Sequence, residues 1–305
     1  MVSTVADLAG DRRRHRRERV VHGVFLVAAA TSVVISAAIV LSLVGRALVF
    51  ITDVDFASLW SSGWFPRRGL YDLRTILVGT LIVAGIAMLV ATPLGLGTAV
   101  YLSEYAKPRT RRLLKPIIEI LAGIPSVVIG FFALTFISPE IVRRLFADAS
   151  FFNMMTAGIG VGILVTPLVA SISEDAMRSV PLSLKEAAYG LGSRKRTATA
   201  RVIFPAAISG IVASLIVGLS RAIGETMVVA IAAGGSGGSA LTFDPLEPGQ
   251  TMTAAMTSLA IGSDQVKGAE NTFESLFFVG LLLFLMTLVL NIMSERFVRR
   301  MRQRY

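Results

Sequence analysis

Two charged side chains, Arg221 and Glu225, interrupt a long apolar stretch of this chain, and their types suit the binding of an anion. Arginine stays ionised in proteins, and its planar guanidinium fork matches a tetrahedral oxyanion. Glu225 lies four residues further on, hence on the same face of a continuous helix, where its charge could balance that of Arg221 in the empty site. Its carboxylate could also accept a hydrogen bond from a protonated oxyanion such as hydrogen phosphate, whereas fully deprotonated sulfate has no proton to donate. The pair predicts an anion site; a structural ion pair that locks two helices together is the alternative.

An apolar helix that starts near Pro205 must position this pair. At about 1.5 Å per residue, Arg221 lies about 24 Å along it, near or beyond the midplane of a bilayer. A charge at that depth costs about 2.5–3.5 kcal/mol even on lenient scales. Small residues recur every four positions along the same helix: Ala206, Gly210, Ser214, Gly218 and Ala222. Such a ridge lets helices approach closely, so we expect Arg221 and Glu225, which flank it, to face protein.

A second pattern occupies the polar and basic segment 186–205, whose row reads EAAYGLGSRKRTATARVIFP. Its charges exclude it from lipid. We expect a short helix over 185–191, ended by Gly190 and Gly192, and a second short helix over 194–204. Pro205 would then begin the apolar helix that follows.

The order Glu186-Ala187-Ala188, then Gly192, then an apolar-x-apolar-Pro that ends at Pro205, resembles the coupling loop of ABC-importer permeases. These are the membrane subunits that an ATPase drives. In this interpretation the small alanines let another protein surface approach, and Glu186 offers a charged anchor. An ordinary basic loop is the alternative.

The composition identifies the chain as a polytopic membrane protein. Of its 305 residues, 54% are hydrophobic and 16% are charged, and its mean hydropathy is +0.70. A soluble domain has about 25% charged residues. Six apolar segments, each near the length that spans a bilayer, predict an all-α fold with six transmembrane helices. They are 23–51, 75–102, 114–137, 153–176, 206–232 and 271–295.

Basic residues gather on one side of these segments. With Arg46 and Arg221 left aside, the two termini and the intervals 103–115 and 177–205 hold 22 Lys and Arg, and the remaining intervals hold six. The positive-inside rule then places both termini and the segment 177–205 in the cytoplasm. This accounts for the net charge of +10 without a nucleic-acid partner. The predicted organisation is a basic tail (1–22), a retained first helix (23–51), an external loop (52–74), a transmembrane domain (75–295) and a second basic tail (296–305).

The residue inventory argues against an enzyme. The chain has no cysteine, and its two histidines lie near the N-terminus, so we expect no metal site. It has no G-x-x-x-x-G-K-[ST] phosphate loop, because none of its five lysines follows a glycine. We therefore expect ATP and magnesium to be bound by a separate ATPase subunit, and no cofactor by this chain.

Two further stretches narrow the resemblance. Residues 92–134, TPLGLGTAVYLSEYAKPRTRRLLKPIIEILAGIPSVVIGFFAL, and the run RAIGETMVVAIAAG with the downstream QTMTA look like the phosphate-specific (Pst) permeases, and more like the PstC type than its PstA-type partner. The resemblance covers about residues 75–295. It implies a type I ABC-importer permease that moves inorganic phosphate across the cytoplasmic membrane. The implied partners are a PstA-type permease, two copies of an ATPase, an external phosphate-binding protein and membrane lipid.

The resemblance also implies roles for individual residues. The substrate path would include Arg221, Glu225, Thr226, Gly123, Pro125 and Ser126, and the coupling residues would be Glu186, Ala187, Ala188, Gly192 and Pro205. The run from Gly123 to Ser126 precedes an expected helix break, where freed backbone groups could line a cavity; a plain proline kink fits as well. Another oxyanion, such as molybdate or sulfate, is the alternative cargo, and a secondary anion transporter is the alternative class. For the Gly-rich loop 233–270, we expect a linker or a contact with an external partner.

Overall fold

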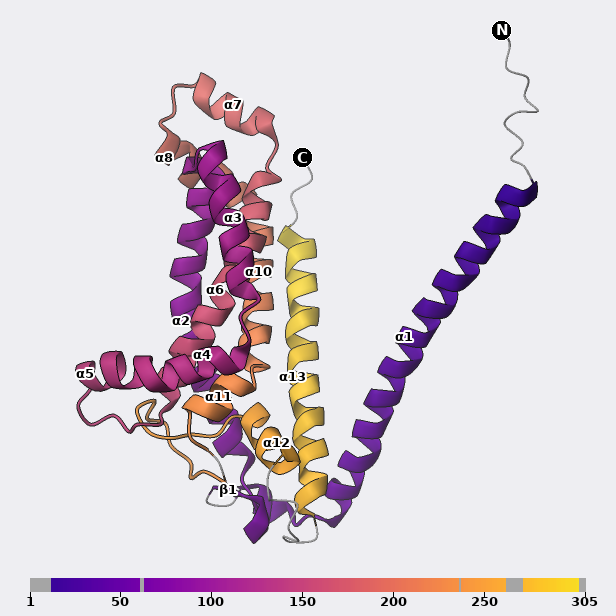
Figure 1. Cartoon of the computed structure of the whole chain (residues 1–305), viewed down its shortest axis with the longest axis vertical. Helices are drawn as coiled ribbons and strands as arrows, with labels where there is room; N and C mark the ends of the chain where they lie inside the picture. Colours follow the sequence, from indigo (N-terminus) through magenta and orange to yellow (C-terminus); the bar gives the residue numbers. More distant parts are fainter. Residues whose placement is uncertain (1–11, 61–62, 236, 262–270, 302–305) are drawn as a thin grey trace.

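The computed structural model describes residues 12–60, 63–235, 237–261 and 271–301 (Figure 1). Five helices in this part of the chain are long and apolar enough to cross a membrane, and one bent pair of helices makes a sixth span. The six-span prediction is confirmed. The longest helices are α1 (Arg12–Asp53), α2 (Leu73–Val100), α6 (Met154–Arg178), α10 (Ile208–Ile223) and α13 (Thr272–Met301).

Helices α2 and α6 form the centre of the bundle, and glycines on α6 allow their close approach. A Cβ added at Gly158 would lie 2.6 Å from Ile86, and one at Gly162 would lie 2.7 Å from Val90. Helix α10 packs against α6, where Gly218 meets Val169. The hydroxyls of Ser173 and Ser214 hydrogen-bond across this contact at 2.6 Å. The small-residue ridge therefore packs against α6.

The third span is broken, as the run from Gly123 to Ser126 predicts. Helix α3 (Pro108–Ala122) ends at Gly123, and α4 (Ser126–Phe132) begins after Pro125, whose ψ of 132° is extended. A π-helical stretch (Ala133–Val142) and α5 (Arg143–Leu145) continue α4. Figure 1 shows α3 running alongside the bundle, with α4 and α5 running across it. The continuous helix long and apolar enough to cross a membrane is Ser126–Leu145 and not 114–137, because the proline stops the helix that α3 begins.

The fifth span is broken twice, which corrects the single helix expected over 206–232. Helix α8 (Lys195–Ala198), a π-helical stretch (Thr199–Ile203) and α9 (Phe204–Ala206) form one rod that meets α10 at a bend of 69°. Pro205 lies inside this rod, where its missing N–H favours the π-helical turn before it, and does not begin the span. A second break at 224–226 separates α10 from α11 (Met227–Ala232).

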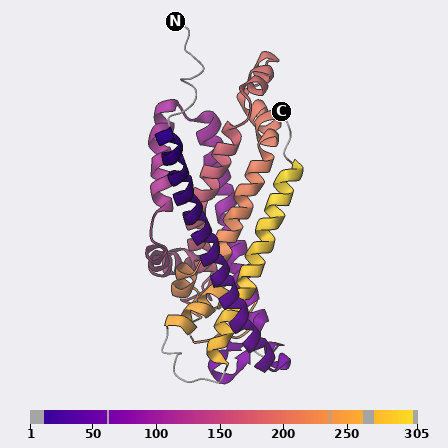
Figure 2. The same cartoon turned by 90° about the vertical axis from the view of Figure 1, so that its right-hand side faces the viewer.

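The end of the bundle opposite α7 (Leu182–Gly190) holds the short elements (Figures 1 and 2). Strand β1 (Trp64–Phe65) pairs antiparallel with β2 (Leu70–Tyr71). The 3-10 helix Phe56–Trp60 precedes β1, and the 3-10 helix Pro66–Arg68 connects the two strands. Trp64 also bridges Ser239, which ties the predicted loop 233–270 to this hairpin. That loop contains a helix that the sequence did not predict, α12 (Met252–Ile261).

Helix α1 stands away from the bundle along most of its length (Figure 1). Its C-terminal end is anchored, because Ala47 and Phe50 are buried and the Phe50 ring stacks on Phe278 of α13. The remainder exposes apolar side chains, as a helix in lipid does.

Candidate functional site

Glu225 lies in the break between α10 and α11 and is buried, with 8% of its surface exposed. Its Oε1 accepts hydrogen bonds from the backbone N–H of Met227 at 3.2 Å and of Val228 at 3.4 Å. The carboxylate therefore caps α11, whose first N–H groups have no helical acceptor. The next residue, Thr226, is half-buried and donates its hydroxyl to the Gly224 carbonyl at 3.3 Å.

Arg221 lies in the last turn of α10 and is exposed. Because the helix ends at Ile223, Arg221 and Glu225 do not share one continuous helical face, and that expectation was wrong. Glu225 faces protein, as expected, whereas Arg221 is exposed on this chain. Among the described residues, no ion pair or side-chain hydrogen bond holds the Arg221 guanidinium, so no ion pair locks helices there. This cation stays available to an external anion.

Helix α4, which follows the break at Pro125, packs against α11, which follows the break at 224–226. Gly130 of α4 faces α11, where an added Cβ would lie 3.0 Å from Ile231 and 3.2 Å from Val228. Gly123 and Pro125 are exposed, and Ser126 is half-buried. Within the described ranges, no side-chain hydrogen bond or ion pair joins these residues to Arg221 or Glu225. An apolar cavity of about 470 Å³ between α2, α3 and α6 contains none of the predicted substrate-path residues.

The start of α12 contacts the Glu225 break, which the sequence did not predict. The Thr253 hydroxyl donates a 2.7 Å hydrogen bond to the backbone carbonyl of Glu225. Thr251 and Thr253 also share a hydrogen bond of 3.0 Å, and both are buried. The sequence QTMTA at 250–254 is the signal that could have indicated this contact. The pattern assigns it to a loop, because a short apolar segment after a Gly- and Pro-rich sequence is typical of one.

The segment 177–205 forms a short helix and a tight turn, as its pattern predicts. Helix α7 is followed by Gly192 at a φ of +77°, which favours glycine. Glu186 and Ala187 are exposed, and so is Pro205, but Ala188 is buried and does not offer a surface to a partner. Ala188 packs inward because it lies on the α7 face opposite the exposed side chains. The sequence interpretation missed two exposed leucines, Leu182 and Leu191.

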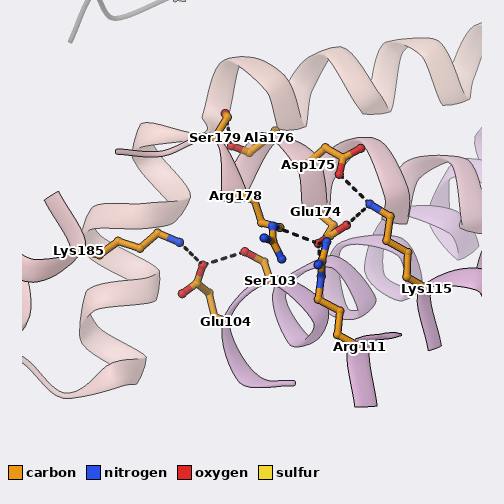
Figure 3. A network of polar contacts seen from close by, with 10 residues as sticks. All are labelled: Ser103, Glu104, Arg111, Lys115, Glu174, Asp175, Ala176, Arg178, Ser179 and Lys185. Carbon is orange, nitrogen blue, oxygen red and sulfur yellow. Dashed lines mark hydrogen bonds and ion pairs between the residues drawn. The ribbon is translucent and has the colours of Figure 1, made fainter. Parts of the chain in front are cut away.

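Two clusters of ion pairs lie near α7, one between α7 and the end of α2 and one between α6 and α3 (Figure 3). Lys185 of α7 binds Glu104 at 2.8 Å, at the π-helical end of α2 (Tyr101–Tyr105). The buried Glu174 of α6 binds Arg111 at 2.6 Å and Lys115 at 2.8 Å, both on α3. We call Glu174, Arg111 and Lys115 the Glu174 network. It joins α6 to α3, the helix that leads into the first break, and the Lys185–Glu104 pair separately joins α7 to the end of α2.

Lys115 lies on α3, outside the segments that cross the membrane. Burial alone would lower the pKa of its ammonium, but the hydrogen bonds and charges of Asp175 and Glu174 outweigh burial and raise this pKa. Lys115 is therefore charged throughout the physiological pH range, and its ion pairs do not act as a pH switch.

Comparisons with known proteins agree with this geometry. Residues 91–303 match the model of a family described as the inner membrane component of binding-protein-dependent transport systems. The chain belongs to this family of permeases. The PstC permease of Pasteurella multocida is 30% identical to it over 88% of this chain and 87% of the relative. The PstC permease of Haemophilus influenzae is 32% identical over 88% and 89%. The resemblance to Pst permeases of the PstC type is thereby confirmed.

Solved structures show the same fold. A bacterial ABC transporter involved in importing the acidic polysaccharide alginate matches 95% of this permease and 99% of the other chain, with a TM-score of 0.65 and 15% identity. The MetNI methionine ABC transporter in an inward-facing conformation matches 75% and 94%, with a TM-score of 0.55 and 16% identity. The permease thus has the fold of type I ABC importers. It is a multi-pass membrane protein and a transport subunit.

Proposed function

We propose that this permease carries inorganic phosphate across the cytoplasmic membrane as the PstC-type subunit of an ATP-driven importer. The observation that carries the proposal is the identity of 30–32% with phosphate permeases over 88% of this chain. A PstA-type permease would complete the membrane core. Two copies of an ATPase would bind ATP and magnesium, and an external binding protein would deliver phosphate, so this chain needs no cofactor.

The Arg221 guanidinium, which pairs with none of the described residues, supports an anion as the cargo. It is exposed at the end of α10, next to a break that holds the Glu225 carboxylate within the protein. A cation without an internal partner inside a membrane is costly, and such residues commonly mark ion pathways. Because the guanidinium donates hydrogen bonds in a fork, it can bind two oxygens of one phosphate. Thr226, Gly123, Pro125 and Ser126 complete the proposed path at the two breaks.

The exposed side of α7 supports the proposed ATPase contact. Glu186 and Ala187 lie on it, and Leu182 and Leu191 add apolar surface, with 68% and 88% of their surface exposed. Ala188, Gly192 and Pro205 would act through the local fold, since they shape the helix, the turn and the rod after it. Movement of a docked ATPase would reach α10 through the rod Lys195–Ala206.

Reconstituted vesicles test this proposal. Uptake of labelled phosphate should need the permease pair, ATP, the ATPase and the binding protein together. Uptake that continues without ATP would indicate a secondary anion transporter. Equal uptake of sulfate or molybdate, delivered by the same binding protein, would overturn phosphate as the specific cargo and leave the ABC mechanism standing.

A further inference from the structure

We propose that Thr253 is a positioning residue that holds Glu225 in the substrate path, and the inference rests on the proposed function. Through this threonine, the external loop that ends in α12 would set the geometry of the break between α10 and α11. The role requires the hydroxyl group of Thr253, and its methyl group alone cannot supply it.

The contact is buried and direct. Thr253 is 4% exposed, and its Oγ1 lies 2.7 Å from the Glu225 carbonyl oxygen. A threonine hydroxyl has one proton, so Thr253 donates to Glu225 and accepts from the Thr251 hydroxyl at 3.0 Å. The two hydroxyls therefore form a directed chain that ends on the backbone of Glu225.

The backbone just before Thr253 is held against α2, at the centre of the bundle. The Thr80 hydroxyl of α2 accepts a 3.0 Å hydrogen bond from the Met252 N–H, one residue before Thr253. A Cβ added at Gly79 of α2 would lie 2.4 Å from the Gln250 carbonyl oxygen, so α2 touches the backbone just before α12. The start of α12, which contains Thr253, therefore connects α2 to the break between α10 and α11.

The same segment presents the carboxylate of Glu225 to α11. Its Oε1 bonds to two N–H groups of α11, and its carbonyl oxygen bonds to Thr253. With backbone and side chain both held, Glu225 has a defined direction while the site is empty. Losing the Thr253 bond would let the break rotate and misplace the carboxylate, at a cost of about ten-fold in transport, the value of one neutral hydrogen bond at its upper range.

The test compares Thr253→Val, which keeps the shape and removes the hydroxyl, with Thr253→Ser, which keeps the hydroxyl. Phosphate uptake per assembled complex should fall about ten-fold in Thr253→Val and stay near wild type in Thr253→Ser. The matched control is Thr257→Val on the same helix, since within the described part of the chain its hydroxyl bonds only to the Thr253 carbonyl. Equal losses in Thr253→Val and Thr257→Val would overturn the proposal.

A double-mutant cycle separates positioning from general destabilisation. In the Glu225→Gln background, Thr253→Val should add little further loss, because the carboxylate that it positions is already absent. A loss that multiplies fully with that of Glu225→Gln would show that Thr253 acts on the fold alone, and would overturn the proposal.

A measurement that does not depend on transport tests this inference separately from the proposal that the cargo is phosphate. The chain has no cysteine, so the thiol introduced by Thr226→Cys is its single thiol, and its labelling in the assembled complex can be read on the separated permease chain. Adding Thr253→Val should speed its labelling several-fold, and adding Thr257→Val should not. An unchanged rate would overturn the positioning role, whereas a wild-type complex that takes up no phosphate would overturn only the proposed function.

Discussion

Arg221 is the residue on which the anion path depends most directly. It keeps a permanent charge at the end of α10, and among the described residues no carboxylate neutralises it. Glu225, which the sequence places as its counter-charge, instead caps α11. The two residues therefore have separate roles in the empty site: one offers charge, and the other shapes the break.

Arg221→Gln should lower phosphate uptake by about 10- to 100-fold, because a hydrogen bond to a charged group contributes about 1.5–3 kcal/mol. Assembly should be unchanged, since the guanidinium forms no ion pair or hydrogen bond with the described residues of this chain. Uptake and co-purification with the ATPase measure the two effects. Arg144→Gln on α5, which removes an exposed pair with Glu140 of the preceding π-helical stretch, is the control. Loss of assembly in Arg221→Gln would mean that the arginine is structural.

Glu174→Gln should destabilise the solubilised permease by about 2 kcal/mol, because it removes a buried charge that pairs with Arg111, Lys115 and, at 3.9 Å, Arg178. The value lies below that of a fully buried pair, since Arg111 and Lys115 are each 25% exposed. Glu295→Gln removes an exposed partner of Arg299 and should change stability by at most about 0.5 kcal/mol. Thermal unfolding followed by tryptophan fluorescence compares the two variants. Similar midpoints would contradict the importance of the Glu174 network.

At the level of elements, the sequence predicts the spans better than their interruptions. Six apolar segments are found because hydrophobic length is a strong signal. The break at Pro125 is predictable because proline lacks an N–H and excludes the helical conformation before it. The break at Gly224 is not, since glycine within a membrane helix usually serves packing, as Gly158 and Gly162 do here.

Helix α12 and the contact of Thr253 illustrate a second limit of the sequence. Ten residues are too few to span a bilayer, so a hydropathy pattern assigns α12 to a loop. The hydrogen bond between Thr253 and Glu225 joins residues 28 positions apart, and no local pattern encodes that pairing. Ala188 is similar: the sequence shows that it is small, but only the fold shows that it faces inward.

The turn after α7 gives a prediction at this scale. Gly192→Ala should cost about 1 kcal/mol, because φ is +77° there and an L side chain is strained. Gly190→Ala, two residues earlier in α7, should be neutral or stabilising, since nothing lies within 4 Å of the added Cβ and alanine favours helix. ATPase stimulation by the loaded binding protein should fall only in Gly192→Ala. An equal fall in both variants would refute the role of the turn.

At the scale of the whole molecule, the charge asymmetry predicts which end faces the cytoplasm. In a chain without cysteine, Ser183→Cys on α7 and Phe243→Cys on the opposite loop give single labelling sites, both at exposed positions. A membrane-impermeant maleimide added to intact cells should label only Phe243→Cys. After permeabilisation, both should react. Labelling of Ser183→Cys in intact cells would reverse the orientation.

The bend at Ala207 determines what kind of motion α10 can receive. Backbone hydrogen bonds continue across it, from Ala207 to Ile203 and from Ile211 to Ala207, and all three residues are buried. A straight helix would transmit a push along its axis, but a rigid elbow converts the push into torque. With α10 about 24 Å long, a turn of about 10° at the elbow would sweep its far end by about 4 Å. That end carries Arg221, so we expect the power stroke to swing the guanidinium sideways across the path rather than drive it along the helix axis.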